Sequence, residues 1–165
     1  MNILDENIPI DQRQLLLSWR IRFRQIGHEI GRRGMQDGEI IPLLHRLEPS
    51  TFFTRDLGFF RRELCDPAYC LVCLEVGQYE AASFIRRALR HTSLSTQARR
   101  SGRVVRVGHA GIRMWRLAGG AGGSGELAAL ASQSCRRKLC GVSSKARGSL
   151  ALADWNAFTS LFRAG

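Results

Sequence analysis

Short apolar runs alternate with helical patterns over the first 117 residues, and this alternation limits the folds that the chain can adopt. Neighbouring parallel strands need a long crossover between them, and a helix is the usual crossover. The sequence therefore predicts an α/β fold with a mostly parallel central sheet and right-handed crossovers. Two β-rich runs around Gly108-His109-Ala110-Gly111 predict a C-terminal β-hairpin, which makes the sheet mixed.

Local patterns give the expected elements. Residues 81–89 place apolar side chains at helical spacing, and residues 69–76 are rich in β-forming side chains. Asp11 is expected to cap a helix over residues 12–19, with Gln14 completing a capping box. Pro42 fits only the first turn of a helix, so its helix is expected to start near Ile41 or to kink. The other expected strands are residues 2–4, 21–26, 51–54, 103–107 and 112–115, with a short helix after Leu57.

The composition changes after Leu117. Gly, Ala and Ser make up over half of residues 118–165, and residues 119–125 have the composition of a flexible linker. No clear strand pattern or long helical period follows. We therefore predict a domain over residues 1–117 and a basic tail over 118–165, which is disordered or foreign to the domain.

Charge is unevenly distributed along the chain. Residues 1–80 hold 12 acidic and 10 basic side chains, whereas residues 81–165 hold 2 acidic and 15 basic side chains, which together give the net charge of +11. Arginine supplies nearly all of the positive charge, and its planar fork matches phosphate. The asymmetry favours a polyanionic partner such as RNA, although a GC-rich gene also enriches arginine.

The apolar pattern excludes an integral membrane protein, and the N-terminus and the cysteines argue against a secreted protein. The longest uninterrupted apolar run, residues 68–74, is far shorter than the ~18 residues of a membrane span, so no membrane role is expected. No basic segment leads into an apolar core near the N-terminus, which argues against a secretory signal. Five scattered cysteines predict reduced thiols and a cytoplasmic location. Cys70 and Cys73 resemble half a zinc site, but in a strand they face opposite sides, so we interpret them as core residues.

Acidic side chains follow several expected strands. Asp5 ends the first strand and Asp56 follows the third, and sites of parallel sheets form beyond the carboxyl ends of the strands. Asp37 and Glu39 start a helix whose preceding loop can reach the same edge. Converging carboxylates repel one another unless a hard cation such as Mg²⁺ or Mn²⁺ binds them. The simpler interpretation is that Asp56 and Asp37 cap helices and that Asp5 is a turn residue.

Three short motifs resemble a bacterial PIN-like family of uncharacterised, toxin-related proteins. The opening Ile3-Leu4-Asp5-Glu6-Asn7-Ile8-Pro9 is similar to the start of that family. Gly34-x-x-Asp37-x-Glu39-Ile40 resembles its second motif, and Thr54-Arg55-Asp56-Leu57-Gly58-Phe59 resembles its third, Thr-x-Asp-x-Asp-Phe. The motifs occur in the order and at the spacing of the family, and the resemblance covers residues 1–117.

The resemblance implies a PIN-like three-layer α/β/α fold and a metal-dependent endoribonuclease, the toxin of a toxin–antitoxin pair. It implies catalytic residues Asp5, Glu39 and Asp56, with Asp37 as a further ligand of Mg²⁺ or Mn²⁺. The expected partners are RNA, an antitoxin protein and a second copy of the chain. The candidate RNA-binding arginines are Arg22, Arg24, Arg86, Arg87 and Arg90, although an arginine face is more often simply solvated.

Gly58 departs from the family pattern, because the family often has a second acidic residue there. The departure supports an alternative function, a catalytically inactive PIN-like module that binds nucleic acid or a partner protein. RNA cleavage that survives both EDTA and Asp5→Asn would exclude the metal mechanism, whereas binding without cleavage would favour the inactive module.

Overall fold

A computed structural model describes residues 1–117 and 128–130. Strands and helices alternate in it, as the sequence predicts. The strands are β1 (Asn2–Leu4), β2 (Arg24–Gln25), β3 (Ser50–Thr54), β4 (Tyr69–Glu75), β5 (Arg103–Gly108), β6 (Gly111–Arg116) and β7 (Ala128–Leu130). The helices are α1 (Ile10–Ser18), α2 (Asp37–Arg46), α3 (Ala81–Arg90) and α4 (Gln97–Arg100), and the 3-10 turns are η1 (Leu57–Phe59), η2 (Arg62–Leu64), η3 (Gln78–Glu80) and η4 (Thr92–Leu94).

All the strands join one sheet in the order β2-β1-β3-β4-β5-β6-β7. The pairs from β2 to β5 are parallel, and β5 and β6 form an antiparallel hairpin. The predicted α/β class, the mostly parallel sheet and the closing hairpin are therefore confirmed. β7 pairs with β6 although no strand was expected after Leu117. The rest of the predicted tail lies outside the described residues.

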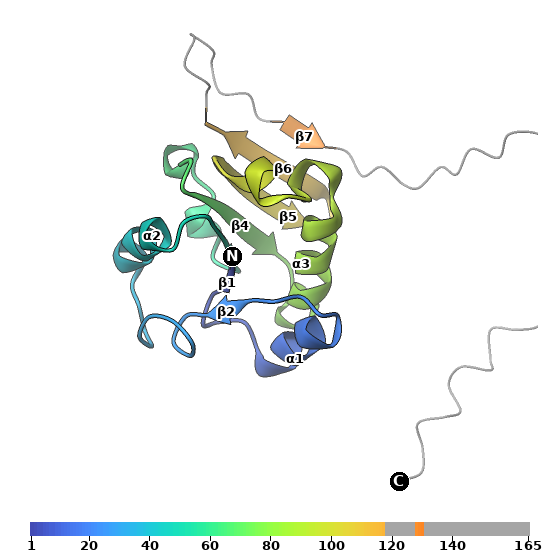
Figure 1. The fold of residues 1–165 in the computed structure, drawn as a ribbon. Helices are drawn as coiled ribbons and strands as arrows, with labels where there is room; N and C mark the ends of the chain where they lie inside the picture. Colours follow the sequence, from blue (N-terminus) through green and yellow to red (C-terminus); the bar gives the residue numbers. More distant parts are fainter. Residues whose placement is uncertain (118–127, 131–165) are drawn as a thin grey trace, which may run out of the picture. The chain divides into compact units, whose positions relative to one another are not determined.

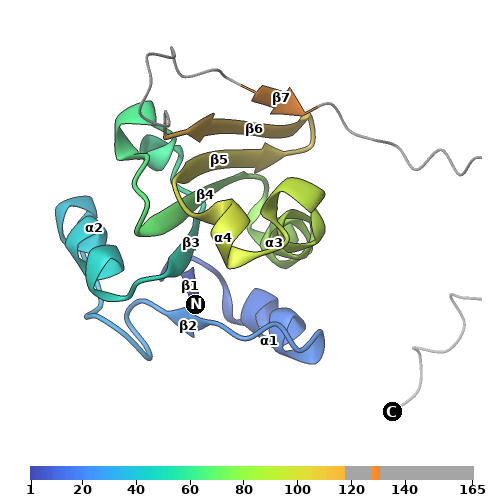
Figure 2. The same ribbon diagram turned by 45° about the horizontal axis from the view of Figure 1, so that its top comes forward.

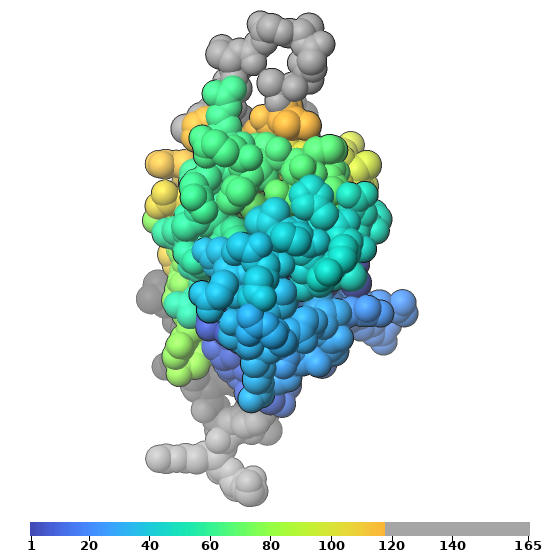
Figure 3. All heavy atoms as spheres, turned by 90° about the vertical axis from the view of Figure 1, so that its left-hand side faces the viewer, coloured from blue at the N-terminus to red at the C-terminus, as the bar shows by residue number. Residues whose placement is uncertain are grey.

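Helices cover both faces of the sheet. Figures 1 and 2 show α1 and α3 on one side of the strands and α2 on the other. In Figure 3, which looks onto the α2 side, atoms of α2 and of the segment leading to it spread over this face. The two faces follow from strand alternation, since successive side chains point to opposite sides. Leu4 and Phe53 pack in the α1–α3 core, whereas Ile3 and Phe52 pack in the α2 core.

Three element boundaries differ from the expectation. α1 begins at Ile10 with Pro9 at its cap, and the Asp11 carboxylate accepts a hydrogen bond from the Gln12 side chain instead of capping. α2 begins at Asp37 and contains Pro42 in its interior, because buried Ile40 and the residues around it anchor its first turns against the sheet. The expected strand over residues 21–26 is shorter and comprises only β2, because among the described strands it pairs with the three-residue β1 alone.

Candidate functional site

Asp5 follows the carboxyl end of β1, beside the end of β3. The parallel register pairs Leu4 with Phe53, and the amide of Asp5 donates to the Phe53 carbonyl at 2.9 Å. This register places Asp5 next to Thr54, whose Oγ1 donates a 2.6 Å hydrogen bond to Asp5 Oδ2. The Asp5 side chain is buried, with 6% of the residue exposed. The carboxylate is therefore fixed by the sheet rather than by a mobile turn.

Thr54 also connects Asp5 to Asp56. The amide of Asp56 donates to Thr54 Oγ1 at 2.9 Å. Asp56 Oδ1 accepts from the Gly58 amide at 2.7 Å, which caps η1 as the simpler interpretation of this residue predicts. A single hydroxyl thus links two of the predicted site residues. We call this arrangement the Asp5–Thr54–Asp56 cluster.

Burial dominates the electrostatics of Asp5. Desolvation raises the pKa of its carboxyl above the ordinary value, and the hydrogen bond from Thr54 and the amides of Glu6 and Asn7 offset this only in part. Within residues 1–117, no Arg or His side chain forms an ion pair with Asp5. Because a buried carboxylate without a cation is costly, the position favours either a proton or a positively charged ligand.

Gln25 holds the loop that carries Asp5. Its Nε2 donates to the carbonyl of Asp5 at 2.8 Å and to that of Ile8 at 3.1 Å, with a longer contact of 3.3 Å to the carbonyl of Glu6. The residue is 1% exposed and lies in β2, the strand that pairs with β1. The sequence does not reveal this positioning residue, because one glutamine in a polar alternation carries no distinctive signal.

Glu6 lines a pocket next to this loop. Its Oε2 accepts from the amide of Gly34 at 2.8 Å, which connects the loop after β1 to the glycine-rich segment before α2. The pocket has a volume of about 230 Å³. Its lining residues are Glu6, Asn7, Ile26, Gly27, His28 and Arg33. Polar groups of both charge signs therefore surround a hollow beside the Asp5 loop.

Asp37 and Glu39, the acidic residues of the second motif, do not belong to the Asp5–Thr54–Asp56 cluster. Arg32 Nη2 donates to both carboxylate oxygens of Glu39, at 2.8 and 2.7 Å, and the Gln36 amide donates to Oε2 at 3.0 Å. The Arg32 guanidinium lowers the pKa of Glu39. Asp37 is exposed at the first residue of α2. In the described part of the chain, no three His, Cys, Asp or Glu side chains are grouped to hold a metal ion.

The two cysteines of β4, Cys70 and Cys73, are buried in the core. Register aligns Thr54 with Cys73 and Cys73 with Arg106 across β3, β4 and β5. Burial raises the pKa of Cys73 to about 12, and the negative charge of Asp56 adds to the effect. Cys70 packs in the opposite core, so the interpretation of both residues as core cysteines is confirmed. The carboxylate of Glu75, which ends β4, is paired with Arg106.

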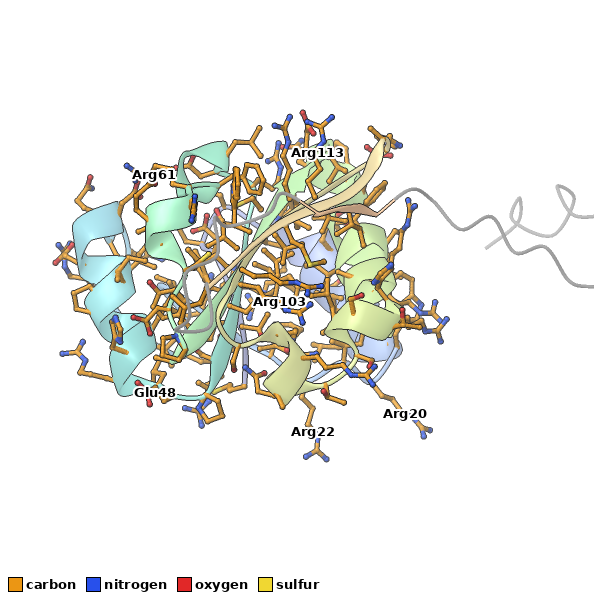
Figure 4. The ribbon with its side chains drawn as sticks, turned by 90° about the horizontal axis from the view of Figure 1, so that it is seen from above. Arg20, Arg22, Glu48, Arg61, Arg103 and Arg113 are labelled. Atoms are coloured by element: carbon orange, nitrogen blue, oxygen red, sulfur yellow. The ribbon has the colours of Figure 1, made fainter. Side chains whose placement is uncertain are left out.

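The candidate arginines lie on β2, on the segment before it and on α3. Arg24 pairs with Ile3 at the middle of β1, and the Asn2 side chain donates to the Arg22 carbonyl, whereas Asp5 follows the end of β1. Figure 4 shows Arg22 extending away from the ribbon beside Arg20. Arg86, Arg87 and Arg90 project from α3. Arg24 therefore lies beside β1 and the last three arginines lie on α3, whereas the Asp5–Thr54–Asp56 cluster lies at the carboxyl ends of β1 and β3.

Comparisons of the chain with protein-family models, with curated proteins and with solved structures gave no match. None of the helices in the described ranges has the length and apolar character needed to cross a membrane.

Proposed function

We propose that the chain is a PIN-like endoribonuclease that uses Mg²⁺ or Mn²⁺ bound at Asp5 and Asp56. The observation that carries the proposal is the buried Asp5 carboxylate at the carboxyl edge of a parallel sheet, with no cationic partner among the described residues. Ligand sites of open α/β sheets form at this edge. A divalent cation would remove the cost of burying that charge.

The donor set fits an open site better than a closed one. Mg²⁺ commonly uses one or two carboxylates, keeps several waters and takes its remaining ligands from substrate phosphates. Asp5 and Asp56, linked through Thr54, supply two carboxylates, and no group of three ligands occurs in the described residues. A bound cation would supply positive charge to stabilise a phosphodiester under attack.

Each residue of the cluster has a distinct task in this proposal. Asp5 provides buried negative charge, which attracts a cation strongly because little water screens it. Thr54 fixes one Asp5 oxygen and orients the backbone at Asp56. Asp56 uses Oδ1 to hold the Gly58 amide, which leaves Oδ2 as the oxygen available to a ligand. Gln25 keeps the Asp5 loop in place through its carbonyl groups.

The test combines cation binding with RNA cleavage. We expect Mn²⁺ titration followed by calorimetry to detect binding to the full chain, and Asp5→Asn to abolish both this heat and the cleavage of a labelled RNA. EDTA should stop cleavage by the unaltered protein. The matched control is Glu63→Gln, which removes an exposed carboxylate in η2. Cleavage that persists in EDTA or in Asp5→Asn would contradict the proposal.

A second function is favoured by Gly58 and by the engagement of Glu39. This chain has Gly58 at the position where the third motif of the PIN-like family has a second acidic residue. Both carboxylate oxygens of Glu39 accept hydrogen bonds from Arg32. Both features reduce the number of available ligands. An inactive PIN-like module that binds RNA or a partner protein, including an antitoxin or a second copy of the chain, is therefore the alternative. Tight RNA binding without cleavage in Mg²⁺ and in Mn²⁺ would support this alternative.

A further inference from the structure

We propose that a groove between α1 and α3 binds single-stranded nucleic acid through its phosphates and one stacked base. The groove has a volume of about 450 Å³. Its lining residues, which we call the arginine groove, are Trp19, Ser83, Arg86, Arg87, Arg90 and His91. This inference does not depend on a cation at Asp5, because binding in the groove requires no cleavage.

The arginine groove carries positive charge that the described residues do not neutralise. Residues 81–117 contain nine arginines and no acidic residue. The arginine ion pairs in the described part of the chain involve Arg13, Arg32 and Arg106. The three groove arginines are therefore available for an anionic partner. A chain of phosphates satisfies several guanidinium groups at once and gains affinity from counterion release.

An aromatic ring gives the groove a stacking surface. The Arg86 guanidinium lies over the Trp19 ring, 4.5 Å from its centroid. Trp19 is half-buried at the C-cap of α1 and packs against the core, so its ring is held firmly. Proteins that bind single strands combine a basic groove with aromatic side chains on which bases stack. A planar base can replace or extend the arginine–indole stack.

The backbone next to Trp19 supports a binding role for this surface. Arg20 has a φ of 59°, a left-handed conformation that glycine usually supplies at the end of a helix. Its amide donates to the Leu17 carbonyl at 2.8 Å, which closes the turn. An arginine here is strained where glycine would not be, and Figure 4 shows its side chain extending away from the ribbon. The chain thus adds another cation beside Trp19.

The groove is separate from the Asp5–Thr54–Asp56 cluster. Gln12 near the start of α1 accepts from the amide of Ala82 near the start of α3, at 3.0 Å, so the helices begin together. Trp19 and Arg90 lie at the other ends of α1 and α3, whereas Asp5 precedes the start of α1. Figure 2 shows α1 and α3 on the same side of the sheet. Binding and cleavage should therefore be separable by mutation.

The experiment measures binding of a fluorescein-labelled single-stranded RNA to the full chain by anisotropy, in EDTA. The groove variant is Arg86→Gln/Arg87→Gln/Arg90→Gln. The matched control, Arg46→Gln/Arg61→Gln/Arg62→Gln, removes the same charge from exposed positions elsewhere, and Figure 4 shows Arg61 on the opposite side of the view from Arg20. We expect the groove variant to weaken binding at least tenfold and the control to change it less than about threefold.

Salt dependence and a charge insertion test the assignment further. Each lost phosphate contact should reduce the slope of log K against log salt by about 0.7, so the groove variant should lose about 2. Ser83→Glu, at an exposed position in the groove, should weaken binding without disturbing the core. Trp19→Leu should weaken binding about tenfold with an unchanged slope, whereas Trp19→Phe should retain most affinity. Thermal unfolding checks that each variant is folded.

Two results would overturn the proposal. Equal weakening by the groove variant and the control would mean that net charge alone binds RNA. Cosedimentation with phosphatidylserine vesicles that requires the groove arginines, without any RNA binding, would assign the surface to a membrane instead. The Trp19 ring beside three arginines suits a nucleotide, whereas a lipid headgroup layer requires no stacking surface.

Discussion

The Thr54 hydroxyl donates a 2.6 Å hydrogen bond to the Asp5 carboxylate and accepts another from the Asp56 amide, although Asp5 and Thr54 are 49 positions apart in the chain. This relationship follows from the parallel register of β1 and β3. It joins the first and third sequence motifs through a side chain that is itself fully buried.

Replacing Thr54 by Val should destabilise the fold by about 1–3 kcal/mol, because the buried Asp5 oxygen loses its donor. The pKa of Asp5 should also increase further. Urea unfolding at neutral pH measures the first effect, and Thr54→Ser is the control that keeps the hydroxyl. A Val variant as stable as the unaltered protein would show that the hydrogen bond does not contribute, because valine keeps the methyl group of threonine.

Asp5 should make stability fall as pH rises. Its folded pKa is raised above the ordinary value of 3.8 that it has in the unfolded chain, so between these two pKa values the native state binds more protons than the unfolded state. The stabilising contribution of protonated Asp5 is complete below the unfolded pKa and is lost as pH rises through the folded pKa. We expect Asp5→Asn to gain stability relative to the unaltered chain as pH rises from about 4 to about 7. A difference that stays constant across this range would contradict the raised pKa.

Asp56 and Glu39 should differ in their effect on cation binding. Asp56 is connected to Asp5 through Thr54, whereas both Glu39 oxygens accept hydrogen bonds from Arg32. We expect Asp56→Asn to weaken Mn²⁺ binding about tenfold or more, and Glu39→Gln to change it less than about twofold, as measured by calorimetry. A large loss in Glu39→Gln would mean that Arg32 releases Glu39 when a cation binds.

Gly58→Asp should introduce the acidic residue that the third motif of the PIN-like family has at this position. A Cβ at this position would lie 3.0 Å from Asp56 Oδ1, so the Asp56 carboxylate must move by a few tenths of an ångström. A second carboxylate there should tighten Mn²⁺ binding about tenfold and increase RNA cleavage. Gly58→Asn is the uncharged control of equal size. If Gly58→Asp and Gly58→Asn have equal Mn²⁺ affinity and equal cleavage, a negative charge at this position does not improve the site.

Gln25→Leu should destabilise the Asp5 loop. The side-chain amide donates to the buried carbonyl groups of Asp5 and Ile8, and leucine cannot replace these bonds. We expect a loss of about 2 kcal/mol or more in unfolding free energy. The control Gln14→Leu changes an exposed glutamine of α1. Faster amide hydrogen exchange at Glu6 and Asn7 would locate the effect in the loop, and unchanged exchange there would contradict it.

The sequence predicts the fold more completely than it predicts the candidate site. Apolar runs and helical spacing indicate each long strand and α3, because burial on both faces of a sheet leaves a continuous signal. Because the carboxyl ends of parallel strands meet at one edge of the sheet, the sequence also indicates that Asp5 and Asp56 approach one another. The Arg32–Glu39 pair and the Gln25 contacts depend on loop conformations, which residue patterns do not specify. The PIN-like family and its activity stay predictions.

Gln25 belongs to a two-residue strand that lies at the edge of the sheet in the described residues and pairs with β1. Short edge strands open more readily than central ones, since few contacts must break. When β2 detaches, the glutamine amide withdraws and the carbonyl groups around Asp5 lose their donor. Water then reaches the carboxylate, and its acidity returns toward that of a free aspartate. Opening of this short edge strand thus sets how often the buried Asp5 carboxylate is exposed to water.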